Sequence, residues 1–482
     1  MTLKQKTFSA VRWTAVAAVA RAVLQVGQMA VLARLLSPKD YGLMAVVGVV
    51  LSFAAVFADL GVNNAYVQRQ GVTQEQRSSL FWLNVSMSTG LTLLVVAVSP
   101  LFARFFGDEH LTPLLMLSAS TFVLSALGQQ VRMAAEKELD FRPVVFLEIA
   151  AAALGFGSAV VAAIAGWGVY SLVVGGIVSA TAGTVLAWMF VARGWRPMWR
   201  LRIGDVRPFL GFGGASVAND IVNQINMTID LLLGGRLMTA AQLGLYSVPR
   251  NLTLQLQFMV NPIITRVGFP LIAQVQSDVA RVRSIYLKTL NMTASTNAPL
   301  YIGIAFFSPE IVALLLGPKW TESAALLRIL AVWGFLRSTG NPVGSLLFGM
   351  GRADIALKWN ATLLFVVPPV MWVGSLYGPD GLAWALLAFS IVMFIPGWYL
   401  LVRPLCHAGL YEYSLAALRP FLLALLSITP AYLLSAQFDV PIVRLTGAVL
   451  ISVPLYLISS YLGNRDWFSA MIELMGRKVV ST

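Results

Sequence analysis

Three arginines lie in the middle of long apolar stretches of this sequence: Arg21, Arg250 and Arg337. Each is about ten residues from the nearer end of its stretch, which places it about 15 Å deep in a membrane if the stretch is a helix. Insertion scales assign a central arginine a cost of roughly 2.5 to 3.5 kcal/mol. We therefore expect these side chains to meet water or an anionic substrate in a cavity, or to form buried ion pairs that only fix helix packing.

A stripe of polar side chains runs along the stretch 208–235. Its members recur at spacings of four, three and four: Asn219, Asn223, Asn226 and Asp230. Residues with these spacings share one face of a helix, and Asp220 and Gln224 widen that face. The stripe predicts either the wall of a cavity that binds substrate or a set of hydrogen bonds between helices.

Two acids of this stripe could couple transport to an ion. Asp220 lies near the expected midplane, and Asp230 lies about one turn from the expected depth of Arg250. Protonation or Na⁺ binding at either acid would change its charge and could change the conformation. A plain salt bridge between Asp230 and Arg250 is an equal alternative.

The sequence offers no set of residues for catalysis. It has one cysteine, Cys406, and its two histidines, His110 and His407, lie far apart. A glycine-rich phosphate loop ending in Lys-Ser/Thr is absent from the sequence. We expect a protein that is not an enzyme and that holds neither a metal nor an organic cofactor.

The composition predicts that these residues are positioned by membrane helices. Of the 482 residues 58% are hydrophobic and only 11% are charged, whereas about a quarter of a soluble chain is charged. Helices are the expected elements, because backbone groups in lipid must be satisfied within their own segment. We count fourteen spans: 11–36, 41–62, 80–103, 111–134, 144–166, 168–192, 208–235, 241–264, 288–308, 324–349, 355–376, 380–402, 416–436 and 440–463.

The loops carry a strong charge bias. With the N-terminus in the cytoplasm, 23 lysines and arginines fall on the inner side and 6 on the outer side. The positive-inside rule supports this orientation, and an even number of spans returns the C-terminus to the cytoplasm. The richest basic segment is 193–207, with five arginines in fifteen residues. We interpret it as a cytoplasmic joint between two lobes.

The sequence also repeats itself. Arg34-Leu-Leu-Ser-Pro-Lys-Asp-Tyr-Gly-Leu43 returns 202 residues later as Arg236-Leu-Met-Thr-Ala-Ala-Gln-Leu-Gly-Leu245. Six spans per copy give a parallel repeat, with the two copies related by an axis along the membrane normal. The predicted all-α fold has a first lobe at 1–192, the joint at 193–207, a second lobe at 208–402, and a terminal helix pair with a tail at 403–482.

The tenth span contains a signal for a helix break beside a buried arginine. Pro342 removes a backbone hydrogen bond and Gly340 weakens the helix further, in the segment Arg337-Ser-Thr-Gly-Asn-Pro342. We expect a hinge or a bent helix there.

The motifs resemble those of the multidrug/oligosaccharidyl-lipid/polysaccharide exporter superfamily, in its polysaccharide-transport branch of Wzx-type flippases. That branch typically reads Ala-Arg-Leu-Leu-Ser-Pro-x-Asp-Tyr-Gly at its first outer turn, as 33–42 does here. The segment Asp59-Leu-Gly-Val-Asn-Asn64 is similar to its next motif. The resemblance covers nearly the whole chain.

The resemblance implies a flippase of the bacterial inner membrane. Its substrate would be an oligosaccharide repeat unit linked to undecaprenyl pyrophosphate, moved from the cytoplasmic to the periplasmic leaflet for exopolysaccharide, capsule or O-antigen assembly. Arg21 matches a cavity arginine of the related peptidoglycan-precursor flippase, and the next such position falls at Gln25 or Gln28 here. The resemblance also implies exchange for H⁺ or Na⁺, and polysaccharide polymerase and chain-length proteins as partners.

Two other functions stay open at this stage. A drug or metabolite antiporter of the same superfamily would favour cationic substrates, and three central arginines argue against it. A membrane scaffold of a polysaccharide synthesis complex would leave the polar stripe without a use. The bottom-up expectation is alternating access of two lobes around a cationic cavity, because arginine binds pyrophosphate well.

Overall fold

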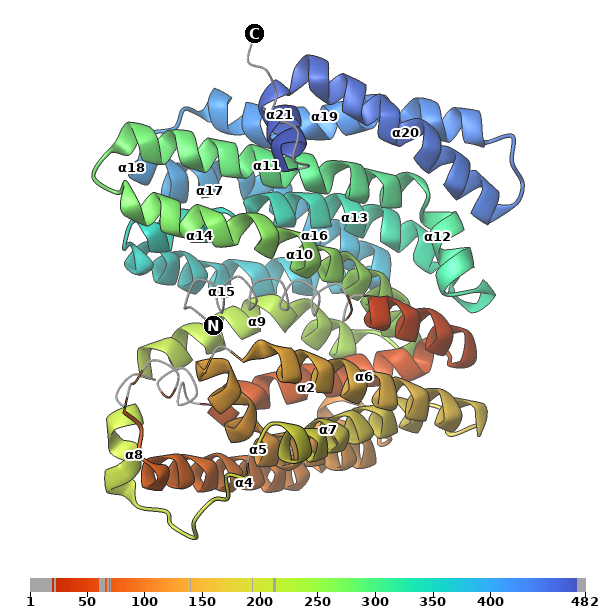
Figure 1. Ribbon diagram of the computed structural model, residues 1–482. Coiled ribbons are helices and arrows are strands. Elements are labelled where there is room, and N and C mark those ends of the chain that lie inside the picture. Colours follow the sequence, from red (N-terminus) through yellow and green to blue (C-terminus); the bar gives the residue numbers. More distant parts are fainter. Residues whose placement is uncertain are drawn as a thin grey trace. The chain divides into compact units, whose positions relative to one another are not determined.

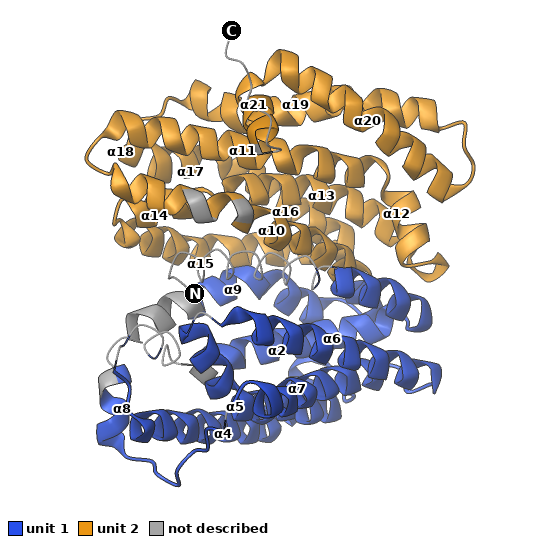
Figure 2. Cartoon of the chain, in the orientation of Figure 1, with its two compact units in different colours: residues 1–244 blue, residues 245–482 orange. Residues whose placement is uncertain are grey.

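The computed structural model describes residues 20, 23–59, 66, 69, 71–138, 140–192, 194–210 and 214–474. Within these residues every regular element is a helix (Figure 1). The chain divides into two compact units, 1–244 and 245–482 (Figure 2). The expectation of an all-helical protein is therefore confirmed.

The helices of the first unit follow one another with short turns. They are a helix at Val23–Leu35, α2 at Pro38–Asp59, α4 at Gln74–Phe106, α5 at Leu111–Lys137, α6 at Phe141–Ile164, α7 at Tyr170–Phe190, α8 at Ile203–Leu210, α9 at Gly214–Leu237 and the start of α10 at Ala240–Gln274. Sequence neighbours pack as pairs, α4 with α5 and α6 with α7, while α2 packs on α9.

Small residues allow the helices of this unit to approach closely. A Cβ on Gly155 of α6 would lie 2.7 Å from the carbonyl oxygen of Gly175 on α7, and one on Gly175 would lie 2.8 Å from Ala159. Between α5 and α7 the Thr184 hydroxyl donates to the carbonyl oxygen of Leu124 at 2.5 Å. Close backbone packing and interhelical hydrogen bonds replace the hydrophobic effect, which does not act between helices in lipid.

The second unit contains the remaining helices. They are most of α10, then α11 at Val279–Phe306, α12 at Ser308–Leu315, η1 at Pro318–Trp320, α13 at Ser323–Gly340, α14 at Val343–Gly349, α15 at Ala353–Ser375, α16 at Gly378–Val392, α17 at Phe394–Gly397, η2 at Trp398–Val402, α18 at Arg403–Cys406, α19 at Leu410–Ser435, α20 at Pro441–Gly463 and α21 at Arg465–Leu474. The long helix α11 packs on both α13 and α19, and α19 packs on α20.

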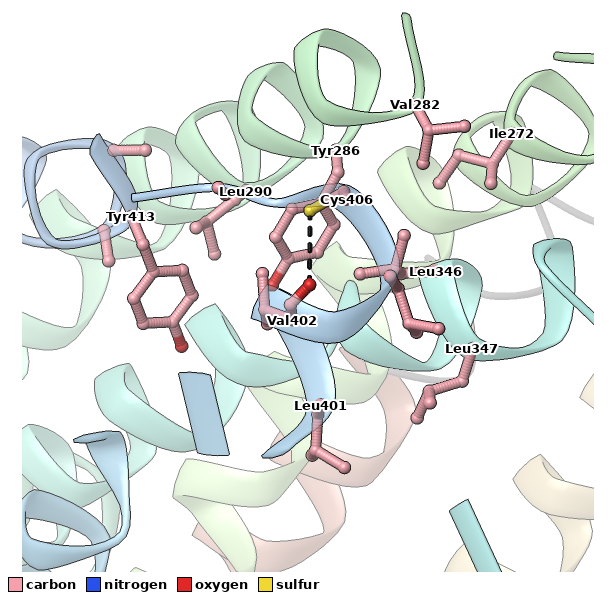
Figure 3. Packing of buried hydrophobic residues seen from close by; sticks show 14 residues of the cluster. Ile272, Val282, Tyr286, Leu290, Leu346, Leu347, Leu401, Val402, Cys406 and Tyr413 are labelled. Carbon is pink, nitrogen blue, oxygen red and sulfur yellow. Dashed lines mark hydrogen bonds between the residues drawn. The ribbon is translucent and has the colours of Figure 1, made fainter. Parts of the chain in front are cut away.

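One core of the second unit gathers around the ends of α11 and α18 (Figure 3). Tyr286 and Leu290 of α11 are fully buried there, together with Cys406. The Cys406 thiol donates to the carbonyl oxygen of Val402, one turn earlier, at 3.4 Å. Cys406 therefore serves packing, as a small apolar residue.

Eight of these helices are long and apolar enough to cross a membrane, or up to ten if each of two bent helix pairs counts as one span. The chain is thus a multi-pass membrane protein. The predicted terminal pair is present as α19 and α20. The count of fourteen and the arrangement in two six-helix lobes stay predictions. The predicted break at Pro342 is confirmed, because α13 ends at Gly340 and α14 begins at Val343.

The basic joint is folded onto the start of α4. The Met198 backbone N–H donates to the Ser78 hydroxyl at 3.1 Å, and the Trp82 indole N–H donates to the Met198 carbonyl oxygen at 2.8 Å. Arg200 pairs with Glu75 at 2.8 Å and with Asp205 at 3.1 Å. Since side-chain and backbone groups both hold it, the described part of this segment is an ordered strap on the first unit.

The turns before α2 and α10 touch within the first unit. A Cβ on Gly42 would lie 1.7 Å from the carbonyl oxygen of Ala240, and a Cβ on Gly244 would lie 1.8 Å from that of Pro38. Gly42 and Gly244 are 202 residues apart, as are Pro38 and Ala240. The contact is therefore reciprocal, as a two-fold axis requires, and the predicted repeat is confirmed at this turn.

Candidate functional site

A buried hydrogen-bond network joins α10, α11 and α13 in the second unit. The Tyr301 hydroxyl donates to the carbonyl oxygen of Thr253 at 3.0 Å and lies 2.9 Å from the Ser338 hydroxyl. Asn261 donates to the carbonyl oxygen of Ser338 at 2.9 Å, and Asn297 donates to the side-chain oxygen of Asn261 at 2.8 Å. All five residues are buried. Satisfied buried polar groups of this kind fix one arrangement of helices.

A glycine makes the network possible. A Cβ on Gly334 of α13 would lie 2.2 Å from Cγ2 of Thr253 and 2.6 Å from the ring of Tyr301. Any larger residue would therefore push α13 away from α10 and α11, and it would lengthen the bonds to Ser338.

Two of the predicted cavity arginines belong to the helices that this network joins. Arg250 is 6% exposed and precedes Thr253 by one turn of α10. Arg337 is half-buried, adjoins Ser338 and lies three residues before the end of α13. Its guanidinium carbon is 5.5 Å from the centre of the Trp333 ring, at which distance a cation–π attraction acts. The network therefore holds the backbone beside both cations.

The predicted polar stripe lies on α9, which packs on α2. The Gln224 amide donates to the Ser52 hydroxyl of α2 at 2.9 Å. Along the stripe exposure falls from Asn223, which is exposed, through half-buried Asn226 to Asp230, which is 2% exposed. One part of the stripe thus holds helices together, as the second interpretation expected, while Asn223 is open.

Other predicted site residues lie at or beyond the limits of the described chain. Arg21 is outside the described residues, and so are the side chains of Asn219 and Asp220, whose backbone is part of α9. Gln25 is exposed and Gln28 half-buried on the helix Val23–Leu35. No contact between these residues and the arginines of the second unit is described.

Sequence reasoning missed the network, although a signal was present. On α10 the buried polar residues follow Arg250 at spacings of three, four and four: Thr253, Gln257 and Asn261. On α11 a matching stripe recurs at spacings of four: Thr293, Asn297 and Tyr301. Both patterns place polar groups on one helical face. Neutral side chains stand out less than arginines in an apolar sequence, so these stripes were overlooked.

The described residues contain no group of three or more histidine, cysteine, aspartate or glutamate side chains that could hold a metal ion. Their chemistry is that of binding: buried guanidinium groups beside amide and hydroxyl groups on membrane helices.

A model of polysaccharide biosynthesis proteins matches residues 31–325, more than half of the chain. The chain belongs to this family. A lipopolysaccharide biosynthesis protein, WzxC of Escherichia coli, is 32% identical over 436 residues, which cover 90% of this chain and 88% of that protein. The teichuronic acid biosynthesis protein TuaB of Bacillus subtilis is 28% identical over 425 residues, 87% of each chain. The predicted family is confirmed.

Solved structures show the same fold at low identity. The chain matches a structure of the lipid II flippase MurJ with a TM-score of 0.76 and 15% identity, over 95% of this chain and 99% of that one. It matches an inward-facing multidrug transporter of the MATE family with a TM-score of 0.60 and 15% identity, over 80% and 97%. These chains are named as a flippase and a transporter, in agreement with a protein that is not an enzyme.

Proposed function

We propose that the protein is a flippase for a lipid-linked oligosaccharide in the bacterial inner membrane. The observation that carries this proposal is the pair of buried arginines, Arg250 and Arg337, beside a polar network in a chain of the polysaccharide biosynthesis family. Relatives named for lipopolysaccharide and teichuronic acid biosynthesis support a glycan substrate, and the MurJ-like fold supports a lipid-linked one.

The substrate would be an oligosaccharide repeat unit on undecaprenyl pyrophosphate. Guanidinium groups of Arg21, Arg250 and Arg337 would bind the pyrophosphate through charge-assisted hydrogen bonds. Amides of the α9 stripe and Gln25 or Gln28 would meet sugar hydroxyls. The prenyl chain would stay in lipid, because each buried methylene favours an apolar surrounding by about 0.8 kcal/mol.

Transport would follow alternating access of two six-helix lobes, within fourteen spans that include the terminal pair α19 and α20. Both termini and the strap 193–207 would be cytoplasmic, so that the head group loads from the cytoplasm and leaves to the periplasm. Asp220 or Asp230 would bind H⁺ or Na⁺ and couple that ion to the motion. Polysaccharide polymerase and chain-length proteins would take up the product.

The test uses a host strain that lacks the gene, complemented with wild type, Arg250→Ala or Arg337→Ala. A charge-assisted hydrogen bond contributes about 1.5 to 3 kcal/mol, so each variant should bind the head group about 10- to 100-fold more weakly. We expect surface polysaccharide to fall and lipid-linked repeat units to accumulate on the cytoplasmic side. Both pools are measured together with the amount of protein in the membrane.

The matched control is Arg352→Ala, an exposed arginine that pairs only with exposed Asp354 before α15. It should complement fully. If Arg250→Ala and Arg337→Ala also complement fully at normal protein levels, the cationic site is refuted. Unchanged polymer in the deletion strain, with altered drug sensitivity, would instead favour an antiporter of the same superfamily.

A further inference from the structure

Two adjoining cavities lie on the first unit, where α5 ends, α6 begins and α7 ends. One has a volume of about 150 Å³ and the other of about 450 Å³, and both are lined by Pro143 and Phe190. Their characters differ. Polar and charged side chains line much of the smaller cavity, and the larger one is almost entirely apolar.

The smaller cavity carries charges of both signs. Arg77 supplies a guanidinium, and Glu138 and Asp140 supply carboxylates. The Arg77 guanidinium carbon lies 3.9 Å from the centre of the Trp195 ring, and this ring stacks on that of Trp188 at 5.7 Å. Stacking on an aromatic face restricts the guanidinium, so the cation has a fixed place in the cavity wall.

The larger cavity is a groove between α6 and α7. Arg142, Phe146 and Ala150 recur every four residues along α6, and Leu186 and Phe190 face them from α7. Phe146 is 54% exposed and Phe190 66%. Arg142 is its only charged lining residue and belongs to the first turn of α6. The groove therefore has a cationic end beside the polar cavity and an apolar length that follows a membrane helix.

We propose that the two cavities together bind one membrane phospholipid whose head group carries a phosphate and a primary amine. Arg142 and Arg77 would hold the phosphate, Glu138 and Asp140 would accept hydrogen bonds from the ammonium, and one acyl chain would occupy the groove. Trp195 belongs to the strap 193–207, so the bound head group would brace the strap against α5 and α6.

The charges select this head group over others. A phospholipid with a phosphate and no amine would place its negative charge beside two carboxylates, which repel it. A choline head carries a cation but has no N–H to donate, so it cannot satisfy the carboxylates by hydrogen bonds. A primary amine alone among the three supplies both the charge and three donors.

The experiment measures thermal unfolding of the full-length purified protein in detergent, with added phospholipids of equal acyl chains. Phosphatidylethanolamine should raise the unfolding midpoint more than phosphatidylglycerol or phosphatidylcholine. The double variant Glu138→Gln/Asp140→Asn should bind it at least about 10-fold more weakly and lose the preference, since charge-assisted bonds are lost. Ala150→Phe, which fills the groove, should abolish stabilisation by all three lipids.

Native mass spectrometry of co-purified lipid gives a second measurement for variants that change packing, and Arg142→Gln tests the phosphate contact without filling space. Asp354→Asn, which alters an exposed carboxylate of the second unit, is the matched control and should keep the full effect. Equal or greater stabilisation by phosphatidylglycerol would overturn the proposal, and so would an undiminished effect in Ala150→Phe. Since no step involves transport, the result stands apart from the flippase proposal.

Discussion

The turns that open α2 and α10 build one geometry from different residues. Before α2, the Asp40 carboxylate accepts hydrogen bonds from the Ser37 backbone N–H at 2.8 Å and from the Ser37 hydroxyl at 2.7 Å. Before α10, the side-chain oxygen of Gln242 accepts from the Thr239 backbone N–H and hydroxyl, both at 3.1 Å. Each copy thus has a hydroxyl residue at the N-cap and an acceptor three residues later.

The comparison shows which features a repeat must keep. The glycines at 42 and 244 are identical, because each lies against the backbone of the other copy and has no room for a Cβ. The caps keep their donors and acceptors but change charge, from carboxylate to amide. Pro38 and Ala240 differ freely, since only their carbonyl oxygens take part in the contact. Backbone proximity therefore constrains the sequence more strongly than capping does.

The largest expected effect comes from adding a methyl group at the contact. Gly42→Ala and Gly244→Ala should each destabilise the protein by about 1 to 3 kcal/mol, because the new Cβ collides with a backbone oxygen and the helices must separate. Thermal unfolding in detergent measures the loss. The matched control is Gly48→Ala on α2, where a Cβ has nothing within 4 Å. That variant should be neutral or stabilising by about 0.5 to 1 kcal/mol, owing to helix propensity.

The double variant sharpens this test. Once one alanine has separated the two turns, the second meets less resistance, so the combined loss should be smaller than the sum of the single losses. Strict additivity would mean that the two glycines do not share one contact.

The next effect concerns the charged cap. Asp40→Ala should cost about 1 kcal/mol, because the first turn of α2 loses its reciprocal hydrogen bonds with Ser37. The carboxylate also lies at the positive end of the helix dipole, which adds to its contribution. Asp40→Asn, which keeps an acceptor without the charge, should fall between wild type and Asp40→Ala. A loss in Asp40→Asn as large as that in Asp40→Ala would show that charge alone matters.

The sequence predicts the helices best where apolar runs are long and uninterrupted. The pair α19 and α20 and the break at Pro342 could be placed within a few residues, because hydropathy and proline act locally. The anchoring of the strap could not be foreseen. It depends on Ser78 and Trp82, which precede it by more than 100 residues and look like ordinary helix residues in the sequence.

The candidate site was predictable only through its charges. Arg250 and Arg337 stand out because an arginine in lipid is costly. Tyr301 and Asn297 are individually unremarkable in a membrane helix, and their importance comes from partners on other helices. A pattern within one helix shows that a face is polar, but the partner of that face is fixed only by tertiary packing.

The smallest expected effect, and the most direct test of the comparison, is at Gln242. Gln242→Ala should cost about 0.5 kcal/mol, less than Asp40→Ala, because a neutral hydrogen bond contributes less than a charge-assisted one. Gln242→Glu should restore the charge found in the other copy and stabilise by about 0.3 to 1 kcal/mol through the dipole of α10. Opposite signs for these two variants, measured by thermal unfolding, would show that both turns obey the same capping physics. If Gln242→Glu destabilises, the amide is required for a reason other than capping, and the two copies differ in more than charge.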